Sequence, residues 1–149
     1  MAQDDSVRVH VTWTEGLQFV AQGERSGAAF VMDSATEHNE RGSGVRPMEA
    51  LLLSLAGCTG MDVISILQKK RQRVTGFRVN VRGIRAEEHP RRYVRIELEY
   101  VVRGWNISAE AVARSIELSQ TKYCSVSATL NAELVHTYRI EQESVPSSD

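Results

Sequence analysis

The sequence predicts an α+β fold in which helices are segregated from mainly antiparallel strands. Several short segments alternate apolar and polar residues, as half-buried strands do, and two longer segments repeat apolar residues at helical spacing. The expected order is β-β-β-α-β-β-α-β, without an internal repeat. A chain of 149 residues can bury a sizeable core without disulfides or metal, so we expect a single domain over residues 1–149.

Three short strands are expected before the first helix, at residues 7–13, 17–21 and 28–32. Glu15-Gly16 offers a turn that would join the first two as a hairpin. The polar stretch 33–45 contains two glycines and is typical of a flexible connection. Residues 1–45 are therefore expected to hold the N-terminal strands and their connection to a helix.

A long apolar helix is expected from Arg46 to Lys69. Pro47 suits a first helical position because it lacks an amide hydrogen, and leucines follow at helical spacing. We expect this helix to be buried on most sides. Its segment Ala50–Leu67 has Asp62 as its one charge, but glycines and hydroxyl residues dilute it, which favours a buried helix over a membrane span.

Cys58 lies in a glycine-flanked part of this helix. Gly57 and Gly60 weaken the helix, and Thr59 and Asp62 have the spacing of a side-chain cap, so a second helical run is expected to begin here. The positive end of a helix stabilises a thiolate, which would make Cys58 reactive. The sequence leaves open the alternative of a small buried apolar residue.

The C-terminal part is expected to add strands and a second helix. The predicted elements are strands around residues 79–81 and 94–102, a turn at Glu88-His89-Pro90, a helix capped by Ser108 that runs toward Tyr123, and a strand over residues 134–140. Residues 46–143 would thus hold the central helix and a C-terminal α/β portion. The tail 144–149 is expected to be disordered.

Charge and cysteine content exclude some functions. A formal net charge of −1 gives no global field for nucleic acid or an anionic membrane, and the basic clusters 69–73 and 91–95 are typical of solvated faces. Two cysteines and a polar start without a signal-peptide pattern indicate a reducing cytoplasm, where a disulfide would be transient.

The sequence gives less support to two other uses of the cysteines, a cysteine hydrolase and a zinc site. A cysteine hydrolase needs a base oriented on its thiol, but no histidine has a recognisable catalytic context. A zinc site from Cys58, Cys124 and two histidines would lack a short ligand pair, so we expect no metal and no organic cofactor. The histidines are His10, His38, His89 and His136.

Three segments taken together form a specific pattern. They are VTWTEGLQF near the start, RPMEALLLSLAGCTGMDVISILQKKRQ in the middle and AVARSIELSQTKYCSVSATL before the last strand. The pattern resembles the OsmC/Ohr family of thiol-dependent peroxidases, and within it the YhfA-like subgroup, over nearly the whole chain. The resemblance implies an OsmC-like fold with long central helices and an intertwined homodimer with active sites at the subunit interface.

The resemblance also implies roles for both cysteines. Cys58 would attack an organic hydroperoxide or hydrogen peroxide and become a sulfenic acid. Cys124 would resolve it as a Cys58–Cys124 disulfide, and an external dithiol would complete the cycle, in oxidative stress defence. The alternative is a weakly catalytic or non-catalytic dimer that binds a small apolar ligand.

Two further site residues are expected beside the thiols. Glu49 matches the family's active-site glutamate in the Pro-x-Glu position, although a carboxylate in a first helical turn also favours the helix dipole. The best-studied branch of the family has an arginine in the turn between its first strands, whereas the turn here, residues 14–16, has none. We expect Arg25 to take the place of that arginine, and Arg41 and Arg46 are the alternatives.

Overall fold

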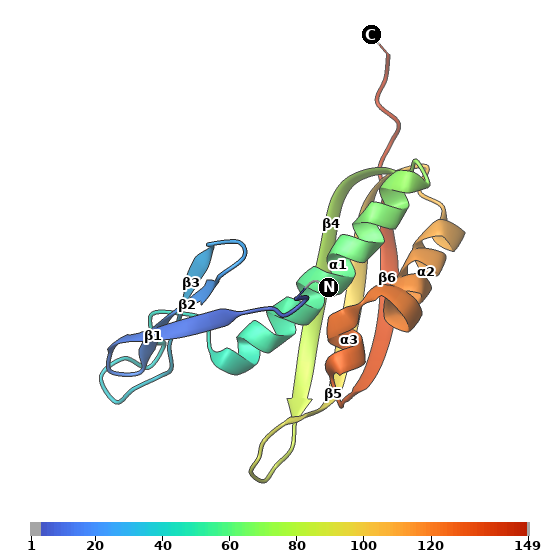
Figure 1. The fold of residues 1–149 in the computed structure, drawn as a ribbon. Coiled ribbons are helices and arrows are strands. Elements are labelled where there is room, and N and C mark those ends of the chain that lie inside the picture. Colours follow the sequence, from blue (N-terminus) through green and yellow to red (C-terminus); the bar gives the residue numbers. More distant parts are fainter. Residues whose placement is uncertain (1–3, 149) are drawn as a thin grey trace. The chain divides into compact units, whose positions relative to one another are not determined.

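The computed structural model describes residues 4–148. The chain divides into two compact units, Met1–Leu51 and Leu52–Asp149 (Figure 1). Helix α1, Pro47–Lys69, crosses the boundary between them. The single domain over residues 1–149 therefore stays a prediction.

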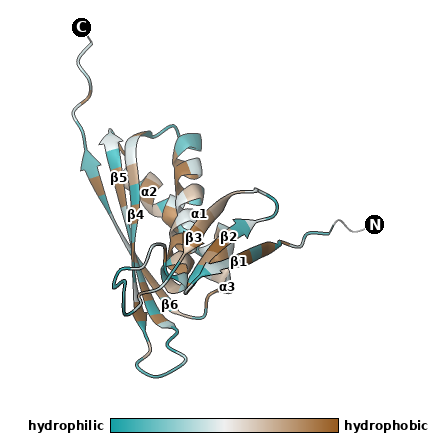
Figure 2. Ribbon diagram, turned by 90° about the vertical axis from the view of Figure 1, so that its left-hand side faces the viewer, coloured by the Kyte–Doolittle hydropathy of each residue, from teal (hydrophilic) through white to brown (hydrophobic). Residues whose placement is uncertain are grey.

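The N-terminal unit contains an antiparallel sheet of three strands in the order β1-β2-β3. The strands are β1 (Val9–Glu15), β2 (Gln18–Gly23) and β3 (Ala29–Met32). The predicted hairpin is confirmed, and Gly16 turns it at a φ of 53°, a conformation that glycine adopts without steric cost. Apolar side chains on β1 are exposed, Trp13 by 62%, and Figure 2 colours much of this strand as hydrophobic.

Helix α1 is continuous, so the predicted break at Gly57–Gly60 is wrong. Glycine costs a helix only about 1 kcal/mol relative to alanine, and packing of the helix's buried side chains outweighs that cost. The buried residues are Leu55, Thr59, Val63 and Leu67, each four positions after the last, which forms one narrow stripe.

The expectation that α1 is buried on most sides is also wrong for this single chain. Leu53 is 59% exposed and Met61 is 72% exposed. By length and composition alone α1 is apolar enough to cross a membrane, a test that core helices of soluble proteins also pass. The helix therefore leaves apolar surface that the described residues do not cover.

The C-terminal unit is built on a second sheet, in the order β4-β5-β6. Strands β4 (Arg73–Arg85) and β5 (Tyr93–Trp105) are antiparallel, whereas β6 (Glu133–Gln142) runs parallel to β5. The pairings β1–β2, β2–β3 and β4–β5 are antiparallel, as the mainly antiparallel expectation has it. The β5–β6 pair is parallel, and it requires a crossover through helices. These are α2 (Ala109–Leu118), the π-helix η1 (Ser119–Tyr123) and α3 (Ser125–Thr129).

Figures 1 and 2 show α1 and α2 on the same side of this sheet. Alternate residues of β5 point toward them and are at most 2% exposed: Ile96, Leu98, Tyr100 and Val102. This matches the period-two pattern predicted for the segment. The predicted α+β class is confirmed, as two small sheets and one long helix. Residues 143–148 form no helix or strand, and residue 149 lies outside the described part.

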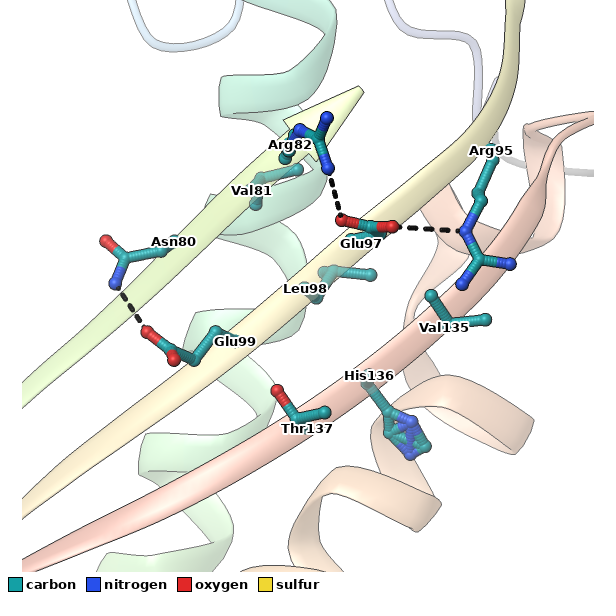
Figure 3. Close-up of a pocket in the computed structure, with 10 residues that line it drawn as sticks. All are labelled: Asn80, Val81, Arg82, Arg95, Glu97, Leu98, Glu99, Val135, His136 and Thr137. Carbon is teal, nitrogen blue, oxygen red and sulfur yellow. Dashed lines mark hydrogen bonds and ion pairs between the residues drawn. The ribbon is translucent and has the colours of Figure 1, made fainter. Parts of the chain in front are cut away.

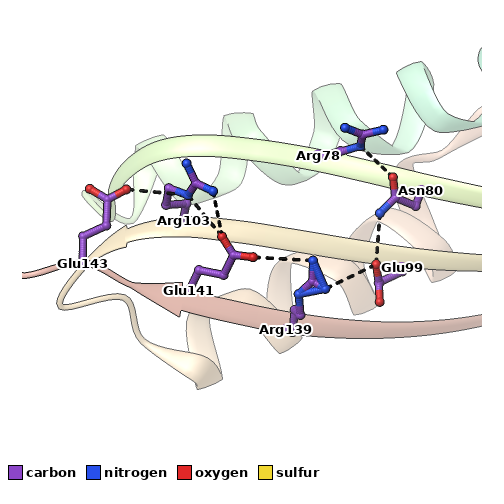
Figure 4. Close-up of polar contacts among 7 residues, drawn as sticks. All are labelled: Arg78, Asn80, Glu99, Arg103, Arg139, Glu141 and Glu143. Atoms are coloured by element: carbon purple, nitrogen blue, oxygen red, sulfur yellow. Dashed lines mark hydrogen bonds and ion pairs between the residues drawn. The ribbon is translucent and has the colours of Figure 1, made fainter.

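The opposite face of the sheet carries paired charges. Arg82 contacts Glu97 at 3.2 Å. Arg103 contacts Glu141 at 3.0 Å, as Figure 4 shows. A depression of about 440 Å³ lies among such side chains, where Glu97 also pairs with Arg95 (Figure 3). The side chains there already satisfy one another, so this depression does not indicate a ligand site.

Candidate thiol site

The C-terminal unit brings the two cysteines together although they lie 66 residues apart in sequence. Both thiols are free; Cys58 is partly buried and Cys124 is 4% exposed. Their sulfur atoms and a carboxylate oxygen of Asp62 all lie within 4.8 Å of one another. Two thiols and an acid therefore form one cluster.

Cys58 lies inside the continuous helix α1, not at a helix start. The helix-dipole argument for a stabilised thiolate therefore does not apply to it. What the helix does provide is spacing. Asp62 follows Cys58 by four residues, so both side chains share one face of α1.

Cys124 is placed by irregular structure that the sequence analysis did not predict. The π-helix η1 ends where the Cys124 amide donates to the Ser119 carbonyl at 2.8 Å. Cys124 then caps α3, and its sulfur accepts a hydrogen bond from the Ser127 amide at 3.4 Å. π-helical turns insert an extra residue and occur often at functional sites. Here that turn leads directly to the buried thiol.

Asp62 is the site residue whose place at the thiols sequence reasoning missed, because it was interpreted only as a helix cap. The Ser119 hydroxyl donates to its Oδ2 at 2.9 Å. The Cys-x-x-x-Asp spacing on an apolar helix was the available signal, since it sets a charge beside a thiol.

A buried hydrogen-bond chain leads to Asp62. The Thr59 Oγ1 atom lies 2.7 Å from the Tyr100 hydroxyl and 2.8 Å from the Ser119 hydroxyl. When Asp62 is ionised it only accepts, so Ser119 must donate to it and in turn accept from Thr59. Thr59 must then accept from Tyr100. The Gln120 amide supports this chain by donating to Thr59 at 3.1 Å and to Tyr100 at 2.8 Å.

Burial sets the ionisation of two groups here. It raises the pKa of the Cys124 thiol, although hydrogen bonds from Ser127 oppose the effect. Burial likewise raises the pKa of Tyr100, against hydrogen bonds from Thr59 and Gln120. Both groups are therefore held in their neutral forms.

Glu49 and Arg25 lie in the N-terminal unit. A Glu49 carboxylate oxygen accepts from the Arg46 amide at 3.1 Å, which is a capping role at the start of α1. Arg25 is exposed in the turn between β2 and β3. A part for either of them in thiol chemistry stays a prediction.

The thiol cluster is also the group of described residues that could hold a metal ion. Two sulfurs and a carboxylate are donors that zinc accepts. The cluster contains none of the four histidines considered from sequence.

Comparison with known proteins identifies the family. The sequence profile described as OsmC-like protein matches residues 39–139. Protein YhfA of Escherichia coli K12 is 38% identical over 136 residues, 90% of this chain and 98% of YhfA.

Solved structures have the same fold. A hypothetical protein from Aquifex aeolicus VF5 matches with a TM-score of 0.82 and 29% identity, over 94% of this chain and 99% of that one. The organic hydroperoxide resistance protein OhrB of Bacillus subtilis matches with a TM-score of 0.57 and 12% identity, over 91% and 98%, which shows likeness of fold alone. The chain therefore belongs to the OsmC-like protein family, as the sequence resemblance predicted.

Proposed function

We propose that this protein is a thiol-dependent peroxidase that reduces organic hydroperoxides or hydrogen peroxide. The observation that carries the proposal is the close approach of two free cysteines, of which one is partly exposed and the other buried. Family membership supports it, because the OsmC/Ohr family includes thiol peroxidases.

In the proposed reaction the two sulfurs act one after the other. The Cys58 thiolate attacks the distal peroxide oxygen, the O–O bond breaks, and an alcohol or water leaves while Cys58 becomes a sulfenic acid. Cys124 then attacks the Cys58 sulfur and a disulfide forms with loss of water. An external dithiol reduces the disulfide and is itself oxidised. The sulfurs must approach to about 2 Å for the disulfide, a short movement from their observed separation.

Exposure supports the assignment of roles. Cys58 is the more accessible thiol, so peroxide reaches it first, whereas the buried Cys124 meets only a sulfenic acid formed beside it. An arginine held by Glu49 would hydrogen-bond the peroxide, and we propose Arg25 for this role.

The test is consumption of cumene hydroperoxide and hydrogen peroxide with an excess of dithiol. Cys58→Ser abolishes consumption, because the thiol that remains at the site, Cys124, is buried and burial raises its pKa. Cys124→Ser reacts with one equivalent and shows a trapped sulfenic acid, but forms no internal disulfide. Ser125→Ala is the matched control, since it adjoins Cys124, is exposed and keeps both thiols. Unchanged consumption in Cys58→Ser would refute the proposal, and thiols that ignore peroxide would favour the ligand-binding alternative.

We also propose that the protein works as a homodimer. Exposed apolar side chains on β1 and α1, among them Val9, Trp13 and Met61, support it, because large exposed apolar surface on a soluble chain marks an interaction site. Sedimentation equilibrium tests this directly. Twice the chain mass is expected, and a monomer across the micromolar range would contradict it.

A further inference from the structure

We propose that Asp62 is the acid–base group of disulfide formation, taking the proton from the Cys124 thiol and passing it to the oxygen that leaves Cys58. The proposal rests on the proposed peroxidase function and adds a catalytic residue to its second step.

The geometry carries this role. A carboxylate oxygen of Asp62 lies within 4.8 Å of both sulfurs, so one acid lies close to the atom that loses a proton and to the atom that releases oxygen. Asp62 lies one helical turn after Cys58, and Ser119 anchors its Oδ2 atom at 2.9 Å. A carboxylate that is anchored beside two reacting sulfurs can transfer a proton once the groups close to hydrogen-bond distance.

Disulfide formation needs a proton-transfer group twice, first as a base and then as an acid. As Cys124 attacks, its S–H bond breaks and its electron pair forms the S–S bond. The S–O bond of the Cys58 sulfenic acid breaks, and its electron pair leaves with oxygen as hydroxide, which requires a proton to become water. Cys124 sulfur is oxidised and Cys58 sulfur is reduced. Asp62 receives one proton and gives one back, so it is unchanged at the end.

The surroundings leave Asp62 as the base available to Cys124. Among residues 4–148, the titratable groups recorded at the cluster are Cys58 and Asp62 from α1, Cys124 after η1, and Tyr100 from β5. Tyr100 is neutral and committed to donating toward Thr59, so it cannot accept the proton. The buried Cys124 thiol is also held neutral, so its attack depends on a base beside it.

The test separates the two chemical steps in single-turnover mixing with one equivalent of peroxide, in buffer that contains a chelator so that bound metal cannot mask the thiols. Asp62→Asn slows disulfide formation by about 10²–10⁴-fold, the usual contribution of general acid–base catalysis. Sulfenic acid formation, measured with Cys124→Ser alone and combined with Asp62→Asn, changes only a few-fold. Asp62→Glu restores part of the rate, and Asp4→Asn, an exposed acid, serves as the control.

The pH profile adds a readout that a purely structural role would not move. In Asp62→Asn the disulfide rate rises steeply with pH, because hydroxide must replace the missing base, whereas wild type varies less. An unchanged disulfide rate, or equal loss of both steps with no change in pH profile, overturns the role of Asp62. Absence of sulfenic acid in every variant overturns the peroxidase proposal itself, and this one with it.

Discussion

The two faces of the β4-β5-β6 sheet use polar side chains in opposite ways. On the helix-covered face, the hydroxyls of Thr59, Tyr100 and Ser119 are fully buried and form one directed chain that ends beside the thiols. On the open face, arginines and glutamates pair in solvent, as Arg82 does with 74% of its side chain exposed (Figure 3). The comparison teaches that burial, more than the number of polar contacts, decides how much a polar group contributes to the stability of the fold.

The largest effect on stability is expected from removing the central hydroxyl of the buried chain. Thr59→Val keeps the shape but leaves the Tyr100 and Ser119 hydroxyls short of a partner, which costs about 1–3 kcal/mol in the free energy of unfolding. Urea denaturation measures it. The matched control is Thr137→Val, on an exposed position of β6, where a change within about 0.5 kcal/mol is expected. Equal losses at both positions would remove the distinction between the faces.

A second prediction concerns alkaline pH. Because burial raises the pKa of Cys124 above its ordinary value of 9.0, the unfolded chain releases the thiol proton first. This contribution to stability is complete below pH 9.0 and is lost as the pH rises toward the folded-state pKa. The reduced protein therefore loses stability above pH 9, and Cys124→Ala shows a shallower decline. Parallel declines would show that Cys124 does not have a raised pKa.

The smallest effect is expected on the open face. Arg82→Gln breaks the contact with Glu97 but leaves both groups in water, so the loss stays below about 1 kcal/mol and shrinks with added salt. Urea midpoints at low and high salt measure it. A loss as large as that of Thr59→Val would mean that the charged pairs on this face stabilise the fold as much as the buried hydroxyl chain does.

Much of the fold follows from the spacing at which apolar residues recur in the sequence. The alternation in β5 and the Glu15-Gly16 turn specified a strand and a hairpin correctly. The break at Gly57–Gly60 failed because glycine propensity is a local quantity, whereas packing of the whole helix decides its continuity. The parallel pairing of β6 and the π-turn η1 depend on long-range packing that no local pattern records.

The site was predictable only in part. The resemblance picked out Cys58 and Cys124, and the structure places them together. Asp62 was missed because its contacts come from a segment 57 residues away in sequence, through Ser119. For Glu49 the capping contact with Arg46 is seen, while its catalytic role, like that of Arg25, stays a prediction.

The most direct test of the central claim is a peptide map of the reduced protein after one equivalent of cumene hydroperoxide. Our account predicts rapid loss of both thiols and one disulfide-linked peptide pair that contains Cys58 and Cys124. Two free thiols after exposure, or oxidation of Cys58 beyond sulfenic acid without the linked pair, would contradict it.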